Sequence, residues 1–234
     1  MQAPTPATTG SSAEPSAEAG FDLDTVEIRV LGVLIEKAFV TPDAYPMSIN
    51  AILTGSNQLT AREPVMSLSE AEVQAAIDSL IGRRLVSKRD QPSARVAKYE
   101  HLVRLRHSLP PPEQAVLATL MLRGAQTAGE LRQRCERLHR FDDIAAVDAV
   151  LEHLAEKYPA LTRPLARAPG TKETRHVHLL GGEAAVEEMA ESQHAGGASA
   201  GRGRIAELED EVRSLREDVE ALRSAFDLFR QQFD

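Results

Sequence analysis

The feature that most constrains the fold of this chain is a capped amphipathic helix over residues 69–83, which a strand follows almost at once. Ser69 is a preferred N-cap residue. Glu70 and Glu72 fall in the first helical turn, where the positive end of the helix dipole favours carboxylates. Apolar residues recur at the spacing of one helix face, which predicts a buried stripe of Val73, Ala76, Ile77, Leu80 and Ile81.

A β-hairpin is predicted directly after this helix. Leu85 and Val86 begin the first strand, residues 91–94 form a turn, and residues 96–103 return as the second strand. A helix that is followed by a hairpin in this way is typical of the centre of a winged-helix domain.

Two helices are predicted ahead of the capped helix. The first begins at a cap provided by Asp24 or Thr25 and shows an apolar face. The second is capped by Ser48 and is stopped by Gly55. Helix, helix, helix and hairpin is the order of a winged helix, so residues 21–107 are predicted to form one such domain.

The same order recurs over residues 108–182, which predicts a second winged-helix domain. Its predicted elements are helices over residues 111–123, 127–138 and 143–157 and strands over residues 161–164 and 176–180. The predicted fold class is therefore α+β, mainly α, with two tandem winged-helix domains of the helix-turn-helix type and a C-terminal coiled-coil helix.

Three segments lie outside these domains. Residues 1–20 are rich in Ala, Pro, Ser and Thr, and we expect a disordered tail because they cannot bury enough apolar surface to fold. Residues 183–203 are predicted to be a flexible linker. Residues 204–234 place apolar side chains at alternating steps of three and four, which is the seam of a coiled coil.

This seam predicts a homodimer. In the first three heptads the a positions hold β-branched residues and the d positions hold Leu, and the flanking positions carry opposite charges. This pattern favours a parallel pair, although a helix folding back on its own domains is the alternative. The predicted dimer seam consists of Ile205, Leu208, Val212, Leu215, Val219, Leu222, Phe226 and Phe229.

Composition limits the function classes. Cys135 is the single cysteine, which excludes an intrachain disulfide and a cysteine-rich zinc site. No apolar run approaches the roughly 20 residues of a membrane span, and the first residues lack the pattern of a signal peptide. We therefore expect a cytoplasmic protein with no membrane partner.

The net charge of −8 is concentrated in the tails. Residues 25–182 hold 21 basic and 18 acidic side chains, so the predicted folded region carries a formal charge of +3. A slightly basic folded region is compatible with an anionic partner such as DNA.

Winged helices usually place their third helix in the major groove of DNA. Here the outward faces of both third helices are acidic, which opposes the approach of phosphates. The first face carries Glu72 and Asp78, and the second carries Asp148, Glu152 and Glu156.

Basic side chains gather elsewhere and are the candidate nucleic-acid-binding residues. The first group, on and beside the first hairpin, consists of Arg83, Arg84, Lys88, Arg89, Arg95 and Lys98. The second group, on and after the helix at 127–138, includes Arg132, Arg134 and Arg137. Either these residues hold DNA phosphates, or they are ordinary solvated surface.

Asn57, Gln58 and Arg62 stand just before the 69–83 helix and have two interpretations. They can hydrogen-bond bases, or they can satisfy carbonyl groups of the loop and the ends of helices. Side-chain chemistry favours the structural role.

The remaining reactive residues form no convincing catalytic set. His176 and His178 share one face of a strand, but no acid or cysteine is near to complete a metal site. Cys135 and His139 lie one helical turn apart without a third partner. Phosphate-binding loops and zinc-protease motifs are absent from the sequence. We predict no enzymatic activity and no cofactor.

Long runs of the sequence resemble the YceH-like family of uncharacterised bacterial proteins. The resemblance is carried by LGVLIEKAFVTPDAYPMSINAI and SNQLTAREPVMSLSE in the first half, and by RGAQTAGELRQRCERLHRFD and APGTKETRHVHLLGG in the second. It covers residues 27–182 and the tail, and it implies two tandem winged-helix domains but no established activity. The family motif maps onto Asn57, Gln58, Arg62 and Pro64, without an assigned role.

These features predict a dimeric, DNA-associated regulatory protein that binds through its basic hairpins. The alternative is a non-enzymatic adaptor that binds a partner protein through the surfaces of its winged helices.

Overall fold

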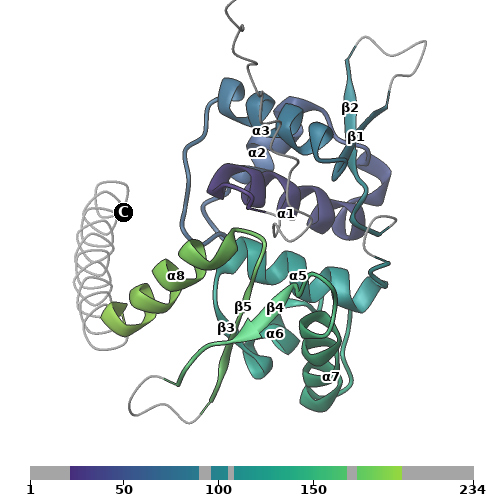
Figure 1. Cartoon of the computed structure of the whole chain (residues 1–234). Helices are drawn as coiled ribbons and strands as arrows, with labels where there is room; N and C mark the ends of the chain where they lie inside the picture. Colours follow the sequence, from purple (N-terminus) through teal and green to yellow (C-terminus); the bar gives the residue numbers. More distant parts are fainter. Residues whose placement is uncertain (1–21, 90–95, 105–107, 168–172, 197–234) are drawn as a thin grey trace, which may run out of the picture.

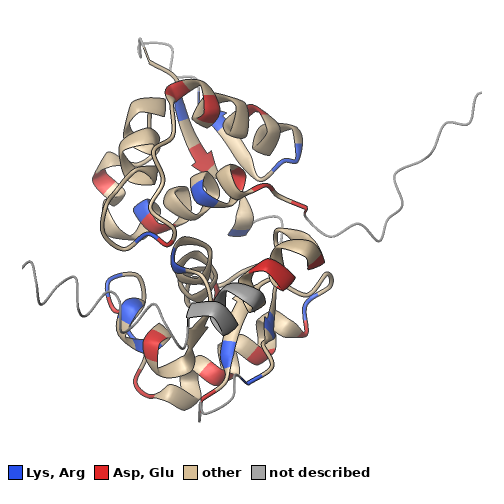
Figure 2. Cartoon of the chain, turned by 90° about the vertical axis from the view of Figure 1, so that its left-hand side faces the viewer, with Lys and Arg blue, Asp and Glu red and all other residues tan. Residues whose placement is uncertain are grey.

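The computed structural model describes residues 22–89, 96–104, 108–167 and 173–196 (Figure 1). It is an α+β protein, mainly helical, with small antiparallel sheets, as predicted. Two halves lie one above the other, and Figure 2 shows the same division after a quarter turn. The predicted tail at 1–20, the hairpin turn at 91–94 and the coiled coil at 204–234 lie outside the described residues.

In its described residues the first half is built from α-helices, a short 3-10 helix and a hairpin. Its elements are α1 (Thr25–Val40), η1 (Pro42–Ala44), α2 (Ile49–Ser56), α3 (Glu70–Gly82), β1 (Val86–Arg89) and β2 (Lys98–His101). The predicted caps form: Asp24, Ser48 and Ser69 each accept a backbone N–H from the first turn of their helix. Local sequence therefore sets where these helices begin.

The second half repeats this order. Its elements are α5 (Pro111–Arg123), β3 (Gln126–Thr127), α6 (Ala128–Arg134), α7 (Ile144–Ala155), β4 (Thr162–Pro164) and β5 (Arg175–His178). Thr127 and Asp143 cap α6 and α7. Gly124, with a φ of 70°, ends α5 as predicted, because glycine adopts this left-handed conformation without steric cost.

Strand pairing is also the same in the two halves. In the second half β5 lies between β3 and β4, and β3 leads directly into α6. In the first half β1 pairs with β2, and Met47, just before α2, bridges Tyr99 on the other side of β2. In each half, therefore, the residues that precede the second helix pair with the last strand of the hairpin.

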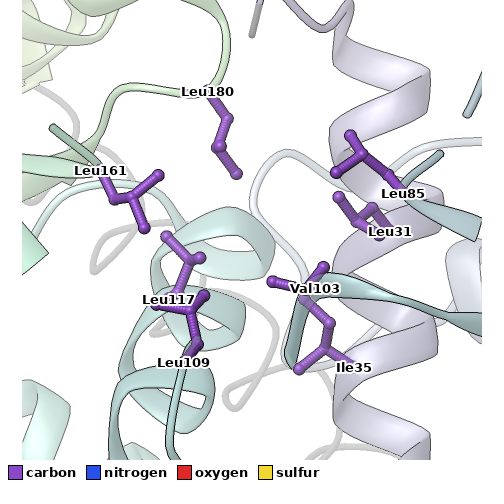
Figure 3. Close-up of a pocket in the computed structure, with 8 residues that line it drawn as sticks. All are labelled: Leu31, Ile35, Leu85, Val103, Leu109, Leu117, Leu161 and Leu180. Carbon is purple, nitrogen blue, oxygen red and sulfur yellow. The ribbon is translucent and has the colours of Figure 1, made fainter. Parts of the chain in front are cut away.

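The two halves share one hydrophobic core, which centres on the contact between α1 and α5. Figure 3 shows Leu31 and Ile35 of α1 facing Leu117 of α5 around a cavity of about 10 Å³. This volume is at the lower limit for one water molecule, so the junction is close-packed. Gly32 permits the close approach, because a Cβ there would lie 3.1 Å from Leu122 Cδ2.

Several predicted element ends differ from those in the structure. The second helix continues through Gly55 to Ser56, because Gly55 packs against α1: a Cβ there would lie 2.8 Å from Val33 Cγ1. The helix predicted over 127–138 ends at Arg134, where Cys135 caps it and a turn brings the Leu138 N–H to the Cys135 carbonyl.

The predicted strands at 96–103 and 176–180 are shorter, at Lys98–His101 and Arg175–His178. Their lengths follow their partners, since the β1–β2 register ends with Arg89 opposite Lys98. A strand is limited by the partner that satisfies its backbone groups.

The linker predicted at 183–203 is helical over its first part, because α8 spans Gly182–Gly196. Val186 of α8 is fully buried and packs with Leu165 and Val177 of the second half. Val186, Met189 and Ala190, spaced three and four residues apart, give α8 an apolar face that packs on this sheet. The small residues that follow α8 in the sequence obscured this pattern. Among the described helices, none combines the length and the apolar character needed to cross a bilayer.

Candidate functional site

The first hairpin carries the basic group predicted for nucleic acid. Arg84, Lys88 and Arg89 are exposed and Lys98 is half-buried, while Arg95 lies outside the described residues. Arg89 Nε lies 2.6 Å from Glu100 Oε1 on the neighbouring strand, so part of its charge is offset. The hairpin is a positively charged surface with one opposing carboxylate among its described residues.

Arg83 has a structural contact of its own. Its Nε lies 3.4 Å from the buried carboxylate of Glu27, and its Nη2 donates to the Asp22 carbonyl. Arg83 thus joins the end of α3 to the start of α1 and contributes less to a binding surface than the sequence indicated.

The second basic group is also partly used within the fold. Arg132 donates to the Phe141 and Asp142 carbonyls, the latter at 2.8 Å. Arg134 donates to Gln126 Oε1 at 2.9 Å. Arg137 is exposed. These contacts attach α6 to neighbouring residues. Arg132 and Arg134 therefore contribute less to a common basic surface than their closeness in the sequence indicated.

The outward faces of α3 and α7 are acidic in the structure. Glu72 and Asp78 are exposed on α3, and Asp148, Glu152 and Glu156 are exposed on or beside α7. Both helices would therefore place carboxylates against DNA phosphates if they entered a groove.

Asn57 of the family motif closes the loop between α2 and α3. Its Nδ2 donates to the Leu68 carbonyl, and its Oδ1 accepts from the Leu68 N–H, both at 2.8 Å. These two hydrogen bonds satisfy both polar ends of the Asn57 amide. They also join the two ends of the loop, which are eleven residues apart in the sequence.

Arg62 lies at the centre of the same loop and is 4% exposed. Its guanidinium donates to both oxygens of Glu36, at 3.2 and 2.6 Å, and to Gln58 Oε1 at 2.7 Å. It also donates to the Gly55 and Ala61 carbonyls. Arg62 and Gln58 are therefore turned into the protein, which agrees with the structural interpretation of the motif.

Arg29 completes this network, and the sequence-based prediction missed it. It donates to the Ser56 carbonyl at 3.1 Å and to the Pro64 carbonyl at 2.6 Å. Burial lowers the pKa of Arg29 to about 10, with the nearby Arg62 as the second cause. The signal that could have found it is a lone cation within the apolar run of α1, since buried charges need partners.

Cys135 and His139 have ordinary structural surroundings. Burial raises the pKa of the Cys135 thiol to about 11, so this sulfur is protonated at neutral pH. His139 packs edge-on against Phe141 at 4.7 Å between ring centroids. Within the described part of the chain, no three His, Cys, Asp or Glu side chains are grouped to hold a metal ion.

Comparison with known proteins finds one family. A family model described as "Protein of unknown function, DUF480" matches residues 23–171. A UPF0502 protein of Azoarcus sp. (strain BH72) is 72% identical over 220 residues, covering 93% of this chain and 96% of the relative. One from Aromatoleum aromaticum is 73% identical over 202 residues, covering 86% and 89%. One from Herminiimonas arsenicoxydans is 49% identical over 229 residues, covering 97% and 96%.

Proposed function

Since this chain belongs to the DUF480 (UPF0502) family of bacterial proteins, whose name assigns no activity, we propose a function from the geometry of the chain itself. We propose that it is a non-enzymatic, DNA-associated regulatory protein built from two winged-helix domains. The winged-helix assignment is supported by the element order helix, helix, helix, hairpin, which occurs twice. It is also supported by the pairing of residues before the second helix with the last strand in each half.

The observation that carries the DNA proposal is the charge of the first hairpin. Arg84, Lys88 and Arg89 precede or lie on β1, and Lys98 lies beside them on β2. Because the outward face of α3 is acidic, the hairpin and not the third helix is the surface that approaches phosphates. This contact would neutralise the backbone and would give little sequence specificity by itself.

We expect charge reversal in the hairpin to abolish much of the affinity for DNA. The triple variant Lys88→Glu, Arg89→Glu and Lys98→Glu removes up to three phosphate contacts. Because each contact contributes about 0.9 to the slope of log affinity against log salt, the slope should fall by about 3. Titration of a mixed-sequence duplex at several salt concentrations measures this.

The charge-matched comparison variant reverses Arg137, Arg140 and Arg167, which are exposed in the second half. Arg137 belongs to the second basic group, so this variant also tests whether that group contacts phosphates. It should retain most of the salt-dependent binding. If both triple variants weaken binding equally, net charge and not the hairpin governs the affinity. If the unchanged protein does not bind duplex at low salt, the DNA proposal is wrong.

A second function, that of a protein adaptor, is favoured by one observation. Leu59 is 81% exposed and Val65 is 53% exposed, on the loop that Asn57 and Arg62 hold in place. Exposed apolar side chains on a fixed loop can anchor a partner chain. Affinity purification from the native cell, scored for both DNA and protein, separates this function from the first.

We also propose, from the heptad sequence alone, that residues 204–234 pair two copies of the chain. Sedimentation of the full chain should give a dimer, and a chain ending at Gly203 should give a monomer. A dimer that persists after this truncation would place the contact between copies elsewhere.

A further inference from the structure

A second cavity, of about 490 Å³, opens between the two halves. Its walls come from the start of α1, the Glu63–Pro64 part of the loop, the end of α5, strand β5 and helix α8. This volume is within the range of roughly 300–1,000 Å³ that small-molecule sites occupy. The cavity is thus large enough for a ligand that touches both halves at once.

The polar wall of this cavity is predominantly cationic. Arg29, Arg123 and Arg175 line it, against the carboxylates of Glu63 and Glu188. Arg175 already donates hydrogen bonds to the Ala125 carbonyl at 2.8 Å and to the Glu130 carboxylate at 2.9 Å, so it is occupied within the fold.

Arg123 is the cation best placed to accept a new partner. It is half-buried, and no hydrogen bond links its guanidinium to any residue that the structure describes. Burial lowers the pKa of Arg123, the nearby cations Arg134 and Arg62 lower it further, and the carboxylate of Glu36 offsets part of this effect. An anion beside Arg123 would relieve both the lost hydration and the repulsion between like charges.

Two buried polar atoms on residues of this wall have no partner. They are Arg29 Nε and His178 Nδ1, on residues that are 2% and 4% exposed. A buried nitrogen without a hydrogen bond costs about 1–3 kcal/mol. Both atoms are buried behind the surface of the cavity, so the polar groups that a ligand can reach come from the other side chains of the wall.

The remaining wall is apolar. Ile28 comes from α1, Met121 from α5, and Ala185 and Met189 from α8. A fully hydrated inorganic ion gains nothing from such side chains, whereas an organic body buries apolar surface against them. Methionine adapts to varied shapes, which suits a site for a small organic molecule.

We propose that this cavity binds a small organic anion, a carboxylate or a phosphate monoester with an apolar body. Its oxygens accept hydrogen bonds from Arg123, and its body lies against Met121 and Met189. Because the walls come from both halves, the bound anion would fix the halves relative to each other. This inference does not depend on DNA binding.

Isothermal titration of the full chain tests the proposal with three probes. Phenyl phosphate and phenylacetate should bind, and the neutral 2-phenylethanol should bind at least about tenfold more weakly. The variant Arg123→Gln should weaken the anions at least about tenfold, whereas Arg123→Lys should keep part of the affinity because it keeps the charge. The control Arg137→Gln removes one exposed charge that does not line the cavity and should change affinity by less than about twofold.

A second readout is the NMR signal of the His178 ring, which phenyl phosphate should shift in the unchanged protein. The proposal is overturned if neither anion binds at about 10 mM, a concentration that populates even a weak site. It is also overturned if Arg123→Gln, shown by its amide spectrum to be folded, binds both anions as the unchanged protein does. If inorganic phosphate binds as tightly as phenyl phosphate, the proposal that the ligand has an apolar body against Met121 and Met189 is wrong.

Discussion

The variant Arg62→Ala should lower the free energy of unfolding by about 3–5 kcal/mol, because breaking a buried ion pair leaves its partner charge uncompensated. The Arg62 side chain is 0% exposed and that of Glu36 is 16% exposed, with 2.6 Å between Nη2 and Oε2. The same substitution also removes the donors to Gln58, Gly55 and Ala61. Urea denaturation followed by circular dichroism measures the loss.

Two comparison variants isolate the cause. Arg62→Lys keeps the charge but cannot donate in the planar fork that reaches Glu36 and two carbonyls, so it should recover only a minor part of the stability. Arg132→Ala removes an exposed arginine that also donates to two carbonyls, and it should cost at most about 1 kcal/mol. A loss below about 1 kcal/mol for Arg62→Ala would mean that the loop is held by other contacts.

The second large effect is expected from Leu117→Ala, which should cost about 2–5 kcal/mol through lost burial and a new cavity. Leu117 is 1% exposed and lies on α5 where it faces Leu31 and Ile35 of α1 (Figure 3). Because this core is shared, the loss should destabilise both halves and not the second half alone. The two halves should therefore still unfold in one transition.

Amide NMR signals from α3 and α7, followed through a urea titration, measure the unfolding of each half separately. Both sets should disappear at one midpoint, which Leu117→Ala moves to lower urea. Leu59→Ala, at a side chain that is 81% exposed, should change stability by less than about 0.5 kcal/mol. Loss of the α7 signals while those of α3 persist would show that the halves fold independently.

These expectations change where a function should be sought. Asn57, Gln58, Arg62 and Pro64 are the residues that the family resemblance singled out, yet the structure uses Asn57, Gln58 and Arg62 in hydrogen bonds that hold one loop. Substitutions there would unfold the loop and would report on stability. The hairpin and the cavity between the halves are the surfaces where a substitution can report on binding.

Features that depend on neighbouring residues were predictable from the sequence. The caps Asp24, Ser69 and Thr127 and the apolar stripe of α3 arise within three or four residues of chain, and the structure forms them. The acidic outward faces of α3 and α7 followed from the same helical spacing. Such features survive folding because their hydrogen bonds and periodicity are local.

Other features were decided by residues that are far apart in the chain. Gly55 could be recognised as a packing residue only once α2 lay against Val33. Several arginines of the predicted basic groups instead bind residues of the fold, as Arg83 binds Glu27. The α8 helix was not predicted, because the sheet surface that buries Val186 is formed by segments distant in the sequence. The small residues that follow α8 also made the whole stretch resemble a linker.

By itself, then, the sequence determined the identity and order of most helices and hairpins in this protein. Tertiary structure alone decided that α1 and α5 join the halves into one core, that Arg29 reaches Pro64 across 35 residues, and that Arg123 and His178 line one cavity. The physical reason is that caps and amphipathic stripes are satisfied by neighbours in the chain, whereas a buried charge is satisfied by whichever distant carbonyl or carboxylate the packed chain brings to it.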